Sequence, residues 1–232
     1  MIPTPAIAAS MAASAVLTMS RERTRVKICG ISDAGHARVA ADAGADAIGL
    51  VFYPDSPRHV ELKAAAAISA ALPPYVMAVG LFVDASAYEV GRTLAAVHLD
   101  LLQFQGEEPP EFCASFGLPF VRAVRMEEGT DLIEYAHRFS RAKALLLDAH
   151  VPGQPGGTGR TFDWAGIPRE VPIALILSGG LTAQNVGRAV REVRPWAVDV
   201  SSGVERERGV KDPAKIVEFI RSVRREDAGQ PA

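Results

Sequence analysis

The chain has 232 residues, of which 48% are hydrophobic and 22% are charged, and 25 Lys and Arg nearly balance 27 Asp and Glu. This length allows one barrel-sized domain or two small ones, and the near-neutral balance argues against nucleic acid or an anionic membrane as the main partner. The two cysteines, Cys29 and Cys113, show neither CxxC nor Cys/His spacing. We therefore expect no disulfide framework, no zinc site and a reducing, cytoplasmic location.

The first 20 residues form an apolar stretch rich in Ala and Ser, and the basic residues of this region, Arg21 to Arg25, come after it. A secretory signal carries its basic residues ahead of the apolar segment, so none is predicted. No uninterrupted apolar run approaches the roughly 20 residues that cross a bilayer. We expect a disordered extension over residues 1–22, a folded domain over residues 23–226 and a tail over residues 227–232.

From Arg25 onward, short apolar runs alternate with segments of helical composition, which is typical of βα units. We expect eight strands, at Val26–Cys29, Ala47–Phe52, Val76–Val83, Leu99–Phe104, Phe120–Val124, Ala144–Asp148, Ile173–Leu177 and Ala197–Val200. Helices are expected between them, at Asp33–Ala43, Leu62–Ala71, Ala87–Ala96, Pro109–Phe116, Asp131–Phe139, weakly after Asp163, at Ala183–Val193 and at Pro213–Val223.

The strand pattern favours a closed sheet. The run 144–147 is apolar at every position, as expected for a parallel strand covered by helices outside and by side chains inside. Eight such units predict a single-domain (β/α)8 TIM barrel. A doubly wound open sheet is the alternative, but it usually carries a glycine-rich fingerprint after its first strand, and the segment 27–30 has no GxGxxG.

Unusual polar residues gather where the expected strands end, which is where such barrels build their active sites. They are Cys29 and Gly30, Ser56-Pro57-Arg58, Asp84, Gln103 to Glu107, Asp148 with Gly153–Gly159, Ser178-Gly179-Gly180, and Asp199 to Gly203.

The loops after the seventh and eighth strands predict a phosphate site. Glycines let backbone N–H groups approach an anion, and a helix starting near Thr182 would add its positive N-terminal end. Barrels commonly bind phosphate at these two loops. Plain turns are the alternative interpretation for either loop alone, and the presence of both loops favours phosphate.

Two residues are candidates for acid and base chemistry. Asp148 ends an apolar strand on the same face as Leu146, where desolvation would raise its pKa, although a strand-ending Asp can also cap a helix. Cys29 could be a small buried hydrophobe, but Lys27 lies two residues earlier on the same strand face and would favour the thiolate. Cys113 lies between aromatic residues and is interpreted as packing.

With these residues in view, the chain resembles the phosphoribosylanthranilate isomerase family from about Arg25 to Val223. The resemblance rests on the order and spacing of several motifs, namely Lys27-Ile28-Cys29-Gly30, Gly49-Leu50-Val51-Phe52 with Ser56-Pro57-Arg58, Val79–Val83, Leu147-Asp148-Ala149 with Gly156–Gly159 and Phe162-Asp163-Trp164, Ser178–Leu181 with Asn185-Val186, and Asp199–Glu205 with Gly209–Asp212.

The resemblance implies an Amadori rearrangement of N-(5'-phosphoribosyl)anthranilate in tryptophan biosynthesis, without metal or organic cofactor, by a monomer or homodimer. It implies that Asp148 is the general acid that opens the ribose ring and that Cys29 is the base that takes the C2' proton. It assigns the anthranilate carboxylate to Arg58 and substrate hydroxyls to Asp199. The phosphate-binding residues it implies are Gly179, Gly180, Ser201, Ser202 and Gly203.

The chain departs from the family pattern at two positions. Gln105 stands where the family often has His, so any positioning of substrate there must use the Gln amide. Ser178 stands where the family usually has Ala, and we expect this change to be tolerated.

Three rival functions remain open at this point. A histidine-pathway isomerase of the same chemistry looks to use an aspartate where this chain has Cys29. A ribulose-phosphate epimerase needs a metal, and the chain has no paired His at strand ends. A barrel that binds a phosphorylated ligand without converting it would have no need for both Cys29 and Asp148.

Overall fold

A computed structural model describes residues 23–149 and 162–229. Its core is a closed barrel in which each strand is hydrogen-bonded in parallel to the next and β8 pairs with β1. The strands are β1 (Arg25–Cys29), β2 (Ala47–Val51), β3 (Met77–Phe82), β4 (Leu101–Phe104), β5 (Phe120–Met126), β6 (Ala144–Ala149), β7 (Ala174–Leu177) and β8 (Ala197–Val200). The predicted TIM barrel is confirmed.

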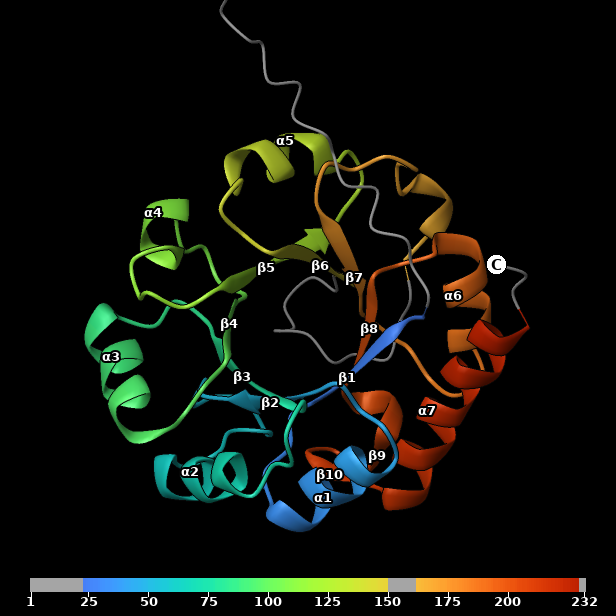
Figure 1. Ribbon diagram of the computed structural model, residues 1–232. Coiled ribbons are helices and arrows are strands. Elements are labelled where there is room, and N and C mark those ends of the chain that lie inside the picture. The colour runs from blue at the N-terminus through green and yellow to red at the C-terminus, as the bar shows by residue number, and fades with distance from the viewer. Residues whose placement is uncertain (1–22, 150–161, 230–232) are drawn as a thin grey trace, which may run out of the picture.

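Helices surround this ring of strands (Figure 1). They are α1 (Ala34–Asp42), α2 (Leu62–Ala70), α3 (Ala87–Ala96), α4 (Pro110–Cys113), α5 (Leu132–Arg138), α6 (Val186–Val193) and α7 (Pro213–Ala228). Two short 3-10 helices, η1 (Trp164–Gly166) and η2 (Ser202–Val204), and a hairpin of β9 (Glu205–Glu207) and β10 (Val210–Lys211) complete the described residues. Within residues 23–149 and 162–229, no helix is both long and apolar enough to cross a membrane.

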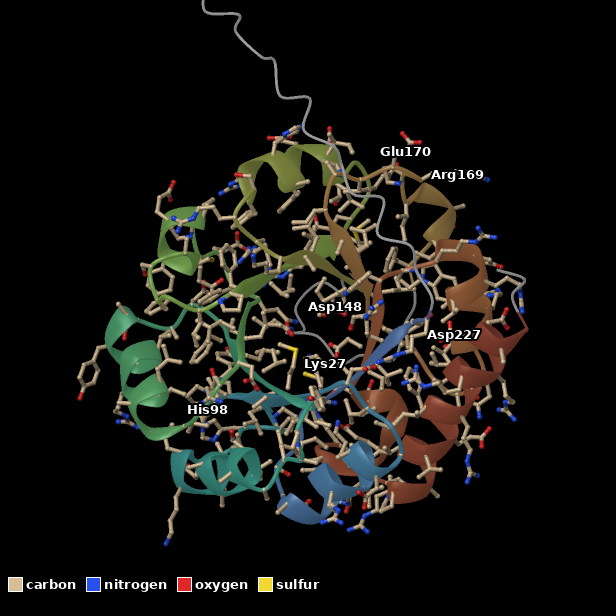
Figure 2. The ribbon with its side chains drawn as sticks, in the orientation of Figure 1. Lys27, His98, Asp148, Arg169, Glu170 and Asp227 are labelled. Carbon is tan, nitrogen blue, oxygen red and sulfur yellow. The ribbon has the colours of Figure 1, made fainter. Side chains whose placement is uncertain are left out.

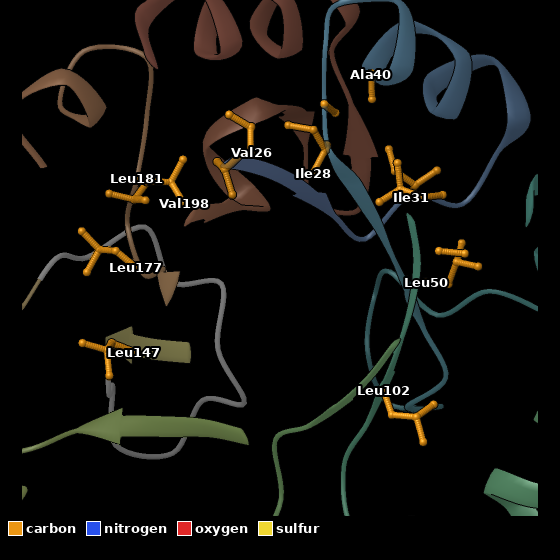
Figure 3. Packing of buried hydrophobic residues seen from close by; sticks show 14 of the residues in the cluster. Val26, Ile28, Ile31, Ala40, Leu50, Leu102, Leu147, Leu177, Leu181 and Val198 are labelled. Atoms are coloured by element: carbon orange, nitrogen blue, oxygen red, sulfur yellow. The ribbon is translucent and has the colours of Figure 1, made fainter. Parts of the chain in front are cut away.

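Alternation along the strands separates an outer core from an inner one. In β6, Leu145 and Leu147 pack toward the helices, whereas Ala144 and Leu146 belong to the cluster inside the barrel. Figure 3 shows part of the outer layer, a cluster that contains strand residues such as Leu50 and helix residues such as Ala40 of α1. Asp148 continues the inner face of β6, as predicted.

The structure corrects several of the predicted helices. Helix α4 ends at Cys113 rather than residue 116, because Gly117 turns the chain at a φ of 73°. Helix α6 begins at Val186 rather than residue 183, since residues 182–185 form a turn closed by the Asn185 side chain. After Asp163 the chain forms only the 3-10 turn η1.

Helix α7 runs beyond the predicted end at residue 223 and through the boundary expected at residue 226. The Asp227 carboxylate accepts hydrogen bonds from the backbone N–H of Thr24 (2.9 Å) and from its hydroxyl (2.7 Å). Arg224 donates to the Thr24 carbonyl at 3.0 Å. These contacts hold the end of α7 against the start of β1, so residues 227 and 228 belong to the barrel and not to a tail.

The expected extension over residues 1–22, the glycine-rich segment 153–159 and the last residues of the tail lie outside the described residues.

Candidate active site

A pocket opens at the carboxyl ends of the strands and contains about 820 Å³ of empty space, part of it open to solvent. Asp148 and Lys27 lie near the barrel axis in Figure 2, whereas His98 and Asp227 lie outside the ring. Every predicted site residue except Gly203 lines this pocket, namely Cys29, Arg58, Gln105, Asp148, Gly179, Gly180, Asp199, Ser201 and Ser202.

The end of β1 brings a thiol and a buried ion pair together. Lys27 Nζ donates to Asp199 Oδ1 of β8 at 2.9 Å, and both side chains are less than a tenth exposed. Gly49 of β2 leaves room for this group, because a Cβ there would lie 2.7 Å from Cys29 Sγ and 3.1 Å from Lys27 Nζ. The thiol therefore packs beside an ammonium group.

Burial and charge oppose each other at Cys29. Burial raises the pKa of the thiol, the positive charge of Lys27 lowers it, and the negative charge of Asp199 raises it again. The net result is a pKa above the ordinary thiol value. Lys27 acts in the predicted direction, but it does not outweigh burial, so the free enzyme holds Cys29 mainly as the thiol.

The surroundings of Asp148 raise the pKa of its carboxyl group. Burial, with a further contribution from the negative charge of Asp199, raises its pKa to about 6. A hydrogen bond from the backbone of Ala149 and the charge of Lys27 act in the opposite direction. A pKa near neutrality is what a general acid at physiological pH needs.

A chain of side-chain amides leads to Asp148. Gln103, which is buried in β4, donates from Nε2 to Gln105 Oε1 at 3.0 Å, and Gln105 Nε2 donates to Asp148 Oδ2 at 3.2 Å. Gln105 therefore contacts the candidate acid and orients it in the pocket.

Arg58 reaches the pocket with one edge of its guanidinium already bound. Its Nε and Nη2 donate to the two carboxylate oxygens of Glu205 at 2.7 and 2.9 Å. The edge formed by Nη1 and the second N–H of Nη2 can still form a two-point contact with a ligand carboxylate.

The loops after β7 and β8 approach each other closely. Gly179 and Gly180 have φ values of 82° and 64°, and a Cβ on Gly179 would collide with the backbone N of Ala149. A Cβ on Gly203 would collide with the Leu181 carbonyl. Gly203 therefore packs closely where the two loops meet and does not line the pocket, and its phosphate-binding role stays a prediction.

Asn185 positions the loop after β7. Its Oδ1 accepts from the backbone N–H of Thr182 at 2.8 Å, and its Nδ2 donates to the Gly180 carbonyl at 2.9 Å. The helix start predicted near Thr182 is thus replaced by a turn that the Asn185 side chain closes.

Comparison with known proteins agrees with this geometry. The model of the N-(5'-phosphoribosyl)anthranilate isomerase family matches residues 26–222. The chain is 58% identical over 196 residues to the enzyme of that name from Thiobacillus denitrificans, covering 84% of this chain and 96% of the relative. It is 55% identical to that from Azotobacter vinelandii, covering 86% and 97%. The chain belongs to the phosphoribosylanthranilate isomerase family.

Solved structures of the family have the same fold. The phosphoribosylanthranilate isomerase of Thermotoga maritima aligns with a TM-score of 0.80 at 40% identity, covering 87% of this chain and 98% of that one. A structure of a phosphoribosylanthranilate isomerase in complex with reduced 1-(o-carboxyphenylamino)-1-deoxyribulose 5-phosphate aligns with a TM-score of 0.76 at 38% identity, covering 87% and 98%.

Four residues that organise the pocket through their contacts had no role in the predictions from sequence. They are Gln103, Asn185, Glu205 and Lys211. Gln103 and Asn185 could have been found by their places beside Gln105 and the Gly179-Gly180 loop. Glu205 and Lys211 lie in a short hairpin of mostly charged residues, and no strand end marks them.

Nowhere in the described part of the chain do three or more His, Cys, Asp or Glu side chains gather so as to hold a metal ion.

Proposed function

We propose that this chain catalyses the isomerisation of N-(5'-phosphoribosyl)anthranilate to 1-(o-carboxyphenylamino)-1-deoxyribulose 5-phosphate, with Asp148 as general acid and Cys29 as general base. The observation that carries this proposal is the placement of both groups on the inner face of one pocket, from β6 and β1. The family membership supplies the substrate class.

Asp148 delivers the first proton. As the anilino nitrogen donates its lone pair to C1', the bond between C1' and the ring oxygen breaks, and Asp148 protonates that oxygen to leave a protonated Schiff base. With a pKa of about 6, roughly a tenth of the Asp148 side chains are protonated at neutral pH. The Asp148 carboxyl group, oriented by Gln105 and lining the pocket, is placed to carry that proton.

Cys29 then removes the C2' proton, and the electron pair of that C–H bond moves toward the iminium carbon. The resulting enolamine tautomerises to the ketone product, as C1' gains a proton and the C2' hydroxyl loses one. The base is the thiolate, and Lys27 is the adjacent cation that favours it. Because burial keeps the thiol pKa high, the productive free enzyme, with protonated Asp148 and ionised Cys29, is the minority protonation state.

The rest of the pocket binds the two charged ends and the hydroxyls of the substrate. The open edge of Arg58 takes the anthranilate carboxylate, Asp199 contacts hydroxyl groups, and the loops at Gly179, Gly180, Ser201 and Ser202 take the phosphate. Gly203, which packs against Leu181, belongs to the same proposed phosphate-binding set.

No cofactor or metal is proposed for this reaction. The proposed form of the enzyme is a monomer or homodimer, and one Thermotoga maritima structure is of monomers generated from a dimeric enzyme of the family. A cytoplasmic location is proposed because both cysteines are buried and form no disulfide within the described residues.

Consumption of the fluorescent anthranilate adduct tests the proposal. The purified chain should convert N-(5'-phosphoribosyl)anthranilate, and the Asp148→Asn and Cys29→Ser variants should not do so at a comparable rate. Binding of the substrate without conversion by the parent chain would instead identify a phosphate-binding barrel that lacks this activity.

A further inference from the structure

Glu205 does not line the pocket, but its carboxylate contacts both proposed anion-binding ends. It binds Arg58 directly and Ser201 through Lys211. It is the first residue of β9, and its side chain is 5% exposed. Burial alone would raise its pKa, but hydrogen bonds from Arg58 and the charge of Lys211 hold the pKa below its ordinary value. The group is therefore an ionised, buried carboxylate with two cationic partners.

The first partner connects Glu205 to the loop after β2. Both oxygens of the carboxylate accept from Arg58 in the paired geometry of a guanidinium and a carboxylate. A hydrogen bond on each oxygen fixes the guanidinium plane. The contact with Glu205 therefore fixes the orientation of the remaining edge of the Arg58 guanidinium, which the flexible side chain alone would not do.

The second partner connects Glu205 to the loop after β8. Lys211 of β10 is 1% exposed, and its Nζ donates to Glu205 Oε1 at 2.8 Å, to the Ser201 carbonyl at 3.0 Å and to Ser201 Oγ at 3.1 Å. All three N–H groups of the ammonium are therefore used. Two of them hold Ser201, which lines the pocket in the proposed phosphate loop.

Backbone contacts reinforce the same connection. The N–H of Gly209, in the hairpin turn, donates to Glu205 Oε2 at 3.2 Å, and a Cβ on Gly209 would collide with the Pro57 carbonyl. A Cβ on Gly30 would lie 2.7 Å from Arg58 Cδ and 3.1 Å from Ser201 Oγ. Arg58 and Ser201 therefore converge on one glycine at the end of β1.

We propose that Glu205 is a positioning residue that holds Arg58 and the Ser201-Ser202 loop at a fixed separation, so that one buried carboxylate sets the distance between the carboxylate-binding and phosphate-binding ends of the pocket. This inference rests on the proposed function for the identity of the two ends. The cluster of Arg58, Lys211 and Glu205 carries a net charge of +1, which suits a site for anions.

The test is equilibrium binding of two separate probes, anthranilate for one end and inorganic phosphate for the other. Glu205→Gln keeps the shape of the side chain but loses the charge and at least one hydrogen bond. We expect the Kd for each probe to rise about tenfold, the loss expected for a buried charged hydrogen bond. Glu205→Gln would thus weaken the binding of both probes, although Glu205 itself does not line the pocket.

Glu108→Gln is the matched control. Glu108 is as buried as Glu205, with a side chain 3% exposed, and it accepts from Arg122 at 2.8 Å, but it does not line the pocket. Its loss should lower the Tm while the Kd of each probe stays within about twofold. Equal weakening of both probes in Glu108→Gln and Glu205→Gln would overturn the proposal, since general destabilisation would then explain it.

Two other outcomes also overturn it, namely unchanged Kd values in a folded Glu205→Gln protein and a change for one probe only. If Glu205→Gln does not fold, Arg58→Lys decides, because lysine keeps the charge but loses the paired contact with Glu205. The proposal requires weaker phosphate binding in Arg58→Lys, and an unchanged phosphate Kd contradicts it. A parent chain that binds neither probe would count against the proposed function itself.

Discussion

The two sides of the pocket control protonation by different means. On the side of β1 and β8, Cys29 lies beside the buried ion pair of Lys27 and Asp199. On the side of β4 and β6, Asp148 is held by the neutral amide of Gln105. We refer to Lys27, Cys29 and Asp199 as the base side, and to Gln103, Gln105 and Asp148 as the acid side.

The difference shows how one pocket can hold an acid and a base. A neutral amide orients a carboxyl group without adding a full positive charge that would hold it ionised, so burial can raise its pKa. A thiol in equal burial would hardly ionise, and it needs an adjacent cation. The shared Asp199 raises the pKa of both groups, which couples the two sides.

Removing the acid should have the largest effect. Asp148→Asn keeps the size and the contact with Gln105 but cannot deliver a proton, so we expect kcat to fall by about 10³-fold or more, near the upper end of the range for positioned proton transfer. The Kd for a product analogue should change little. Turnover within tenfold of the parent would remove Asp148 from the acid side.

The same variant should be more stable than the parent. The folded-state pKa of about 6 lies above the ordinary value for Asp, so ionisation of Asp148 opposes folding as the pH rises from about 4 through 6, by roughly 2–3 kcal/mol at pH 7. Asp148→Asn removes this cost, and its Tm at pH 7 should exceed that of the parent by several degrees. At pH 4 the difference should largely vanish.

Removing the base should lower kcat almost as much as removing the acid. Cys29→Ser replaces a thiolate by a much weaker base at nearly the same volume, and we expect kcat to fall about 10²–10⁴-fold. If Cys29 is only a packing residue, the variant will keep turnover within a few-fold of the parent and will lose some stability instead. Rates and melting curves of the two proteins separate these accounts.

A smaller effect is expected from the amide chain. Gln105→Leu removes the hydrogen bond that orients Asp148 and favours its ionised form, so the pKa of Asp148 should rise. The loss of orientation should lower kcat/KM about three- to tenfold, although the higher pKa enlarges the protonated fraction of Asp148. The decrease should come with an acidic limb of the pH profile shifted to higher pH. A lower rate with an unshifted limb would mean that Gln105 contacts substrate only.

The sequence predicts most of the barrel and much of the pocket for a local reason. In units such as β6, an apolar run ends in a polar residue, and the alternation of side chains places Asp148 inside. The place of Gly203 could not be predicted, since its close contact with Leu181 depends on how two loops meet.

Pairs of residues far apart in the chain were also not predicted from the sequence. Arg58 and Glu205 are separated by 147 positions, and nothing near either residue shows that one edge of the guanidinium is occupied. The net pKa of Cys29 is a similar case. The sequence places Lys27 beside it, but the degree of burial that outweighs Lys27 depends on packing of β1 against its neighbours.

The pH dependence of kcat/KM tests the coupled acid and base sides most directly, because it reports the pKa values of the free enzyme. For the parent we predict an acidic limb near pH 6, from Asp148, and an alkaline limb above the ordinary thiol pKa, from Cys29. Asp199→Asn removes the charge that raises both pKa values, so both limbs should move to lower pH even where the variant binds substrate more weakly. An acidic limb near the ordinary Asp pKa of about 4 in the parent, or limbs that do not move in Asp199→Asn, would contradict the account.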